Sequence, residues 1–204
     1  MAKTKVWIIS KYATPTKYPR HFGIGQALVA KGLDVTLIAS VSNSVAAADV
    51  PKFNGWAKVE NHNGLKVVWM NGPSITNTGI IRIFSWFWFE FKVMMTMLFK
   101  ISKPDATVSS SLSLLSVWSG FLLSRRFKSL FIFEVRDIWP LSLIELGGYS
   151  ESNILIRFLK YTELLGYRKA DAIIGTMPNL KGHVQNVCPD AAEKVVCVPQ
   201  GVFL

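Results

Sequence analysis

The chain has 204 residues, of which 50% are hydrophobic and 18% charged, and its formal net charge is +10. This length allows one large domain or two small ones, and the composition excludes intrinsic disorder, which needs low hydrophobicity and high charge density. Two cysteines, Cys188 and Cys197, are too few for a disulfide scaffold. We expect them to be thiols in a cytoplasmic protein, and no ligand spacing indicates a metal site.

The first half of the chain begins like a βαβ unit. An apolar run at 6–9 predicts a buried strand, and a polar loop with two prolines follows it. A helix is predicted over 20–31, with Gly32 as its C-cap because glycine adopts the left-handed conformation without strain. A second buried strand follows at 35–39. Continuous apolar strands of this kind are typical of a parallel sheet that is covered on both faces.

Strands and helices continue to alternate to the end of the chain. After a polar stretch at 40–56, two extended segments flank Asn63-Gly64, a hairpin turn signal. The later predicted elements are a helical aromatic segment at 80–101, a strand at 106–110, a helix at 112–127, a strand at 129–135, a helix at 153–169, a strand at 172–175, a helix that begins at Pro178, and a strand at 195–199. This alternation predicts an α/β, doubly wound, mostly parallel, Rossmann-like sheet.

In such a sheet a ligand binds beyond the carboxyl ends of the strands, so the residues that follow each strand are the candidates for a site. The densest group is Glu134-Val135-Arg136-Asp137-Ile138-Trp139-Pro140. Asp137 is the predicted catalytic residue, because a carboxylate there can accept a hydrogen bond from a substrate hydroxyl. A simple ion pair between Arg136 and Asp137 is the alternative. Glu134, Arg136, Trp139 and Thr176 are predicted to bind substrate.

Arg20 and His21 are also predicted to bind substrate, because they begin a helix whose free N–H groups can hold a phosphate. The alternative is a solvated basic loop. Gly23-Ile24-Gly25 does not fit a dinucleotide fingerprint, since it lies far beyond the first strand and no acid follows the second. The chain also has no Walker motif and no nucleophile elbow at 109–111.

Several of these segments together resemble one family. They are the opening strand with its loop, Arg20-His21-Phe22, the segment 26–36, Lys103-Pro104-Asp105, 134–140, 170–174, and Val198-Pro199-Gln200-Gly201-Val202. The chain resembles the N-terminal half of GT-B glycosyltransferases of the retaining family-4 type, especially the bacterial enzymes that assemble capsule, O-antigen and exopolysaccharide. The segment Glu-x-Arg-Asp-x-Trp-Pro is the specific part of this resemblance.

The resemblance implies a two-domain enzyme in which residues 1–204 form the acceptor-side domain and a second domain binds the nucleotide-sugar. No cofactor is implied, because the nucleotide-sugar is a substrate. The position of Asp137 contacts the transferred sugar or the acceptor in similar enzymes. The chain has Arg136 where many relatives have histidine, its first loop lacks a Gly-Gly pair, and it has no Glu-x7-Glu donor motif. We therefore expect no activity from the chain alone.

The aromatic segment 80–101 is apolar around most of its helical wheel, with Glu90 as an exception. It has the length of a membrane span, but Glu90 and Lys92 near its middle argue against one. A deeply buried helix is one interpretation. The other is a helix at the inner face of the cytoplasmic membrane, with Trp86 and Trp88 at headgroup level and Arg82 and Lys92 at anionic lipid. The family resemblance suggests an acceptor linked to polyprenyl diphosphate, which would suit that position.

Two other function classes remain open at this stage. One is a non-catalytic, membrane-attached binding subunit that recruits a separate catalytic chain. The other is a nucleic-acid binder, which the net charge allows; the basic residues are spread along the sequence and form no recognised motif, so we expect no nucleic-acid partner.

Overall fold

The computed structural model describes residues 3–17, 19–42, 47–73, 79–96 and 103–201. Eight strands form one sheet in the order β3-β4-β2-β1-β5-β6-β7-β8. Their bounds are β1 Lys5–Ile9, β2 Asp34–Ser40, β3 Ala57–His62, β4 Leu65–Met70, β5 Ala106–Ser110, β6 Leu130–Val135, β7 Ala172–Gly175 and β8 Val195–Cys197. Every pairing is parallel except that of β3 with β4. The predicted α/β, mostly parallel fold is therefore confirmed.

Two turns have the predicted chemistry. Asn63 and Gly64 join β3 to β4 with φ angles of 53° and 86°, the left-handed values that a two-residue hairpin turn requires. Gly32, with φ of 90°, follows the first helix, where an L side chain would be strained.

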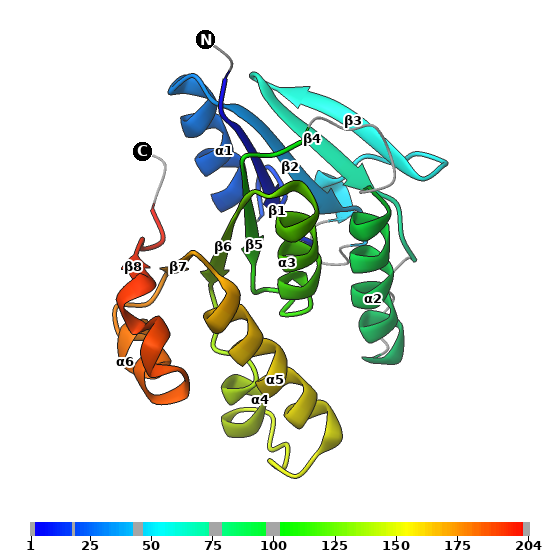
Figure 1. The fold of residues 1–204 in the computed structure, drawn as a ribbon. Coiled ribbons are helices and arrows are strands. Elements are labelled where there is room, and N and C mark those ends of the chain that lie inside the picture. The colour runs from blue at the N-terminus through cyan, green and yellow to red at the C-terminus, as the bar shows by residue number, and fades with distance from the viewer. Residues whose placement is uncertain (1–2, 18, 43–46, 74–78, 97–102, 202–204) are drawn as a thin grey trace.

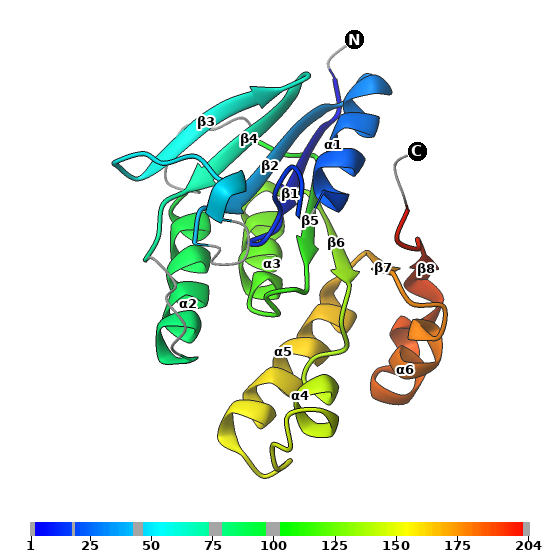
Figure 2. The ribbon, with the colours of Figure 1, turned by 180° about the vertical axis from the view of Figure 1, so that it is seen from behind.

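Helices cover both faces of the sheet (Figures 1 and 2). Their bounds are α1 Arg20–Ala30, α2 Gly79–Met95, α3 Ser116–Phe127, α4 Leu141–Glu145, α5 Ile154–Lys169 and α6 Leu180–Val187. Along β1, Val6 and Ile8 face α1, whereas Trp7 and Ile9 face α2 and α3. The register carries that second face across to Phe133 of β6, which packs against α5. Side chains of α1 thus lie on one face, and those of α2, α3 and α5 on the other.

The structure adds elements that the sequence pattern did not predict. Among the described residues, these are the short helix α4 and the 3-10 helices η1 at Ala47–Asp49 and η3 at Pro189–Lys194. The helix expected to begin at Pro178 begins at Leu180, and α2 occupies the first part of the predicted segment 80–101, whose residues 97–101 lie outside the described part. Within the described residues, no helix combines the length and apolar character needed to cross a bilayer.

Candidate functional site

Arg136 and Asp137 follow β6 directly and lie at the carboxyl edge of the sheet, the edge at which its parallel strands end. Ser111, which follows the neighbouring strand β5, fixes their backbone. Its hydroxyl accepts a hydrogen bond from Arg136 N at 2.9 Å and donates one to Asp137 O at 3.4 Å. Ser111 is fully buried, whereas Arg136 and Asp137 are half-buried, so the two charged residues stand on a rigid support at the rim of the edge.

Asp137 also positions the helix that follows it. Its Oδ1 accepts a hydrogen bond from Ser142 Oγ at 2.6 Å, and Ser142 is in the first turn of α4. Thr176, beyond β7, donates to Arg136 O at 3.4 Å. The structure thus brings Arg136, Asp137 and Thr176 together, as predicted from their places after strands. Ser142 leaves the other carboxylate oxygen of Asp137 available to a ligand hydroxyl.

Arg20, His21 and Glu134 form a buried ionic cluster. Arg20 Nε donates to Glu134 Oε1 at 2.8 Å, and His21 Nε2 lies 2.6 Å from Glu134 Oε2. The Arg20 guanidinium also donates to Pro199 O at 2.9 Å and to Val198 O at 3.0 Å. These residues are therefore not a solvated basic loop, and their charged groups bind one another and the segment after β8.

Burial alone would raise the pKa of Glu134, but the charges and hydrogen bonds of His21 and Arg20 outweigh burial and hold that pKa at about 2. His21 Nδ1 is buried and has no hydrogen-bond partner among the described residues. A carboxylate that stays ionised between two basic groups is a fixed negative charge in the interior, and Glu134 holds it in β6, just before Arg136 and Asp137.

Trp139 and Trp86 meet at the same edge. Their rings make an edge-to-face contact with centroids 6.0 Å apart, and Trp86 Nε1 donates to Tyr12 OH at 2.5 Å. Tyr12 belongs to the loop after β1. The three half-buried aromatic side chains connect this loop, α2 and the segment before α4, so Trp86 of α2 lies beside Trp139, two residues after Asp137.

The distribution of polar and apolar side chains on α2 is the reverse of that on an ordinary surface helix. Three of the polar residues of α2, Ser85, Glu90 and Lys92, are buried. Among the side chains of α2 that the structure describes, the exposed large apolar ones are Ile81, Ile83, Phe84, Phe87 and Phe91. We call Phe84, Phe87 and Phe91 the aromatic face; they are 55%, 52% and 41% exposed.

Two of the residues predicted to contact lipid, Lys92 and Trp88, are less exposed than the aromatic face. Lys92 is turned inward and donates to Trp56 O at 2.9 Å, so its ammonium does not project from the helix surface. Trp88 is half-buried and stacks on Phe84 at 6.0 Å. Arg82 is in the same helix, but its side chain lies outside the described part of the structure.

Glu90, the acid in the aromatic segment, is buried beside α3. Ser119 Oγ donates to Glu90 Oε2 at 2.5 Å. Burial raises the pKa of Glu90 to about 8, although Ser119 and the charge of Lys11 act in the opposite direction. The acid is thus accommodated by protonation and hydrogen bonding.

Sequence reasoning did not select Ser142, the support from Ser111, or the aromatic face. Ser111 carried a usable signal, since it follows a strand next to β6. The aromatic face carried a usable signal too. The polar residues of α2 form a narrow stripe, and neighbouring elements can hydrogen-bond such a stripe inside the protein, which turns the aromatic residues outward. Among the described residues, no cluster of three or more His, Cys, Asp or Glu side chains has the geometry to hold a metal, and both cysteines are free thiols.

Comparison with known proteins gives similarity of structure alone. No family model matches this chain, and no curated protein matches it. Among solved structures, sucrose-phosphate synthase of Thermosynechococcus elongatus aligns with 98% of this chain and 90% of its own, at 15% identity and a TM-score of 0.58. E. coli trehalose-6-phosphate synthase bound with UDP-2-fluoro glucose aligns with 98% of this chain at 10% identity and a TM-score of 0.61. HepE of Anabaena, in complex with UDP and glucose, also aligns with 98%, at 10% identity and a TM-score of 0.57.

The chain spans 49% of the E. coli protein and 45% of the Anabaena protein. At identities of 15% and below, these alignments establish the fold and nothing finer. The fold of this chain is thus α/β and Rossmann-like, and it is similar to the fold of domains in these three glycosyltransferase structures.

Proposed function

We propose that this chain is the acceptor-side domain of a retaining glycosyltransferase that moves a sugar from a nucleotide-sugar to a glycan in bacterial surface polysaccharide synthesis. The observation that carries the proposal is the half-exposed Asp137 on its fixed support at the carboxyl edge of a GT-B-type sheet. Structural neighbours bound with UDP, glucose or a UDP-sugar support the same reaction class.

The roles of the residues follow from their positions. Asp137 accepts a hydrogen bond from a hydroxyl of the acceptor or of the transferred sugar. The accepting atom is the carboxylate oxygen that is not bonded to Ser142. Arg136 and Thr176 line the same rim, and Trp139 with Trp86 supplies an apolar wall for a sugar ring. Arg20, His21 and Glu134 form a buried cluster next to these residues, and Arg20 also binds the segment after β8. The second domain binds most of the nucleotide-sugar.

The same protein is proposed to work at the inner face of the cytoplasmic membrane, on an acceptor linked to polyprenyl diphosphate. The aromatic face of α2 is the supporting observation, because exposed phenylalanines on one helix insert into the interfacial region of a bilayer. The formal charge of +10 adds attraction to anionic lipid.

Sugar transfer is tested with the gene product as its host makes it, incubated with a labelled UDP-sugar and membrane extract. Asp137→Asn is expected to lower turnover at least tenfold with an almost unchanged melting temperature, because the amide oxygen still accepts from Ser142. The exposed Asp190→Asn is the matched control. Unchanged turnover in Asp137→Asn would remove Asp137 from the site.

The domain arrangement is tested by the intact mass of the native gene product. About twice the mass of this chain supports a two-domain enzyme, whereas 22.8 kDa supports a chain that works with a separate partner. The second result would favour the non-catalytic binding subunit.

Membrane docking is tested by co-sedimentation with vesicles. Replacing Phe84, Phe87 and Phe91 by serine is expected to abolish binding, while the control Leu146→Ser with Ile154→Ser, which removes other exposed apolar side chains, retains it. Equal binding by the two variants would contradict docking through α2.

A further inference from the structure

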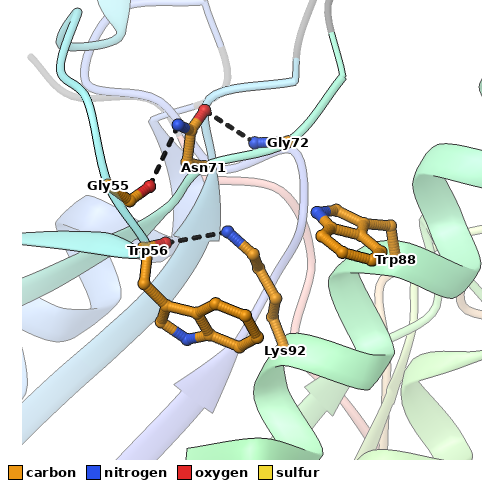
Figure 3. Close-up of a pocket in the computed structure, with 6 residues that line it drawn as sticks. All are labelled: Gly55, Trp56, Asn71, Gly72, Trp88 and Lys92. Atoms are coloured by element: carbon orange, nitrogen blue, oxygen red, sulfur yellow. Dashed lines mark hydrogen bonds between the residues drawn. The ribbon is translucent and has the colours of Figure 1, made fainter.

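A pocket with a volume of about 330 Å³ lies beside the aromatic face, between α2 and the segments that flank β3 and β4. Figure 3 shows its six lining residues: Gly55, Trp56, Asn71, Gly72, Trp88 and Lys92. Asn71 and Gly72 follow β4, so the pocket opens at the carboxyl edge. Four strand spacings separate β4 from β6, which places the pocket roughly 19 Å from the end of β6, where Arg136 and Asp137 lie.

Lys92 is the chemical centre of this pocket. Its side chain rises from α2 between two indole rings, with Nζ 4.5 Å from the ring centre of Trp56 and 5.8 Å from that of Trp88 (Figure 3). The ammonium donates to Trp56 O at 2.9 Å, and the residue is only 3% exposed. Burial lowers the pKa of Lys92.

In the described part of the chain, no carboxylate lies within ion-pair distance of this ammonium. One backbone carbonyl and two ring faces attract a cation but do not neutralise it. A buried charge without a counterion is costly, and an anion in the pocket would offset part of that cost. The remaining polar lining is neutral: the Asn71 amide donates to Gly55 O and accepts from Gly72 N.

The surroundings of the pocket indicate where the anion comes from. Phe91 of the aromatic face lies 6.3 Å from Trp56 and 5.8 Å from Trp88, measured between ring centroids. The pocket and the aromatic face therefore share their rim. If the aromatic face enters the interfacial region of a bilayer, the pocket comes to lie at headgroup level, where phosphates are concentrated.

We propose that the Trp56–Trp88–Lys92 pocket binds the phosphate of an anionic membrane lipid headgroup. This inference rests on the membrane docking of the proposed function and adds a specific headgroup site to it. Lys92 supplies the positive charge. The indole rings of Trp56 and Trp88 form the walls of the pocket, and the lipid headgroup enters between them, beside Phe91.

The test uses the purified chain and two kinds of vesicle, phosphatidylcholine alone and phosphatidylcholine with 30% phosphatidylglycerol. We expect the chain to prefer the anionic vesicles, and Lys92→Gln to lower affinity for them by about fivefold while binding to the neutral vesicles stays the same. Glutamine retains a donor for Trp56 O without the charge. The control Lys169→Gln removes an exposed charge from the end of α5 and is expected to keep the preference.

A second measurement separates a lipid headgroup from free phosphate. The indole N–H signals of Trp56 and Trp88 are followed by NMR during titration with monomeric dihexanoyl phosphatidylglycerol or with inorganic phosphate. Shifts with the lipid that exceed those with phosphate, and that Lys92→Gln abolishes, support the headgroup site. Equal shifts with phosphate alone would overturn the headgroup in favour of a soluble anion.

The remaining outcomes are also decisive. If Lys92→Gln and Lys169→Gln lose the same affinity for anionic vesicles, the site is overturned and docking stands. If the chain binds neither vesicle, docking fails and the headgroup site fails with it. If Lys92→Gln does not fold, Lys92→Met is read by the same two measurements.

Discussion

Glu134 is the carboxylate on which both basic residues of the first turn of α1 depend. Replacing it by glutamine leaves Arg20 buried without its counterion, so Glu134→Gln is expected to cost about 3 kcal/mol of unfolding free energy at pH 7. An acid whose folded-state pKa is lowered, here from 4.5 to about 2, stabilises the fold above pH 4.5 and loses that contribution as the pH falls toward 2. Urea unfolding from pH 7 to pH 2.5 should show the difference from wild type shrink over this interval. The exposed Glu193→Gln should show no such cost.

For Glu90 we expect the opposite pH dependence of the unfolding free energy. Its folded-state pKa of about 8 lies above the ordinary 4.5, so the folded state holds this proton more tightly and the unfolding free energy falls as the pH rises from 4.5 to 8. Glutamine is a neutral replacement of the same shape. Glu90→Gln should therefore gain stability relative to wild type between pH 5 and pH 8 in urea unfolding, whereas the exposed Glu145→Gln should not. Parallel pH profiles would mean that Glu90 is already ionised beside Lys11.

At the scale of elements, two aspartates in equivalent positions stabilise the pairing of neighbouring strands. Asp105 precedes β5, and its backbone N–H and Oδ2 pair with Lys5 O and N, both at 2.8 Å. Asp171 precedes β7 and pairs in the same way with Phe131, again at 2.8 Å for both bonds. In each case the carboxylate supplies an acceptor to the N–H of the neighbouring strand, which extends the ladder by one bond.

This arrangement predicts a local effect in Asp171→Ala. The Phe131 N–H would lose its acceptor inside the sheet, at a cost of about 1–2 kcal/mol, and its amide should exchange faster with solvent. Asp171→Asn keeps an oxygen acceptor and should lose less. Hydrogen exchange by NMR is the measurement, with Asp190→Ala as control. Unchanged protection of Phe131 would show that the side-chain bond adds nothing to the ladder.

The predictability of these elements differed for a physical reason. Apolar runs and turn residues are local signals, so the strands, the hairpin at Asn63-Gly64 and the end of α1 at Gly32 could be predicted from sequence. For α2 the local signal predicted a helix but not its orientation. The usual rule turns a polar stripe outward, whereas here Ser119 and the Trp56 carbonyl receive Glu90 and Lys92 inside the protein.

Across the whole molecule, a long-range contact could be predicted only where the order and direction of the strands specify it. Asp137 and Thr176 could be placed together because parallel strands end at one edge. The cluster of Arg20, His21 and Glu134 could not, because it joins α1 to the end of β6 through side-chain directions that periodicity does not specify. The same residues therefore looked like ligand-binding groups in the sequence and are internal partners in the structure.

Arg20 connects the start of α1 with the last part of the described chain. Its guanidinium donates to Glu134 and to two successive carbonyls, those of Val198 and Pro199, while Val198 N donates to Gly175 O at 2.8 Å. A planar fork with several donors can serve these three acceptors at once, and a lysine ammonium at the end of a flexible stem does so less well. Arg20→Gln should cost about 3 kcal/mol and Arg20→Lys less.

The expected signature of these variants is local as well as global. Hydrogen exchange measured by mass spectrometry should increase in a peptide covering 195–201 for both variants, and remain unchanged in one covering β2. The exposed Arg157→Gln serves as the matched control. If exchange in 195–201 stays at the wild-type level in Arg20→Gln, the pairing of β7 with β8 holds this segment without Arg20. If exchange increases, Arg20 couples the segment after β8 to the buried cluster, and a movement of that segment would change the contacts of Glu134 and His21.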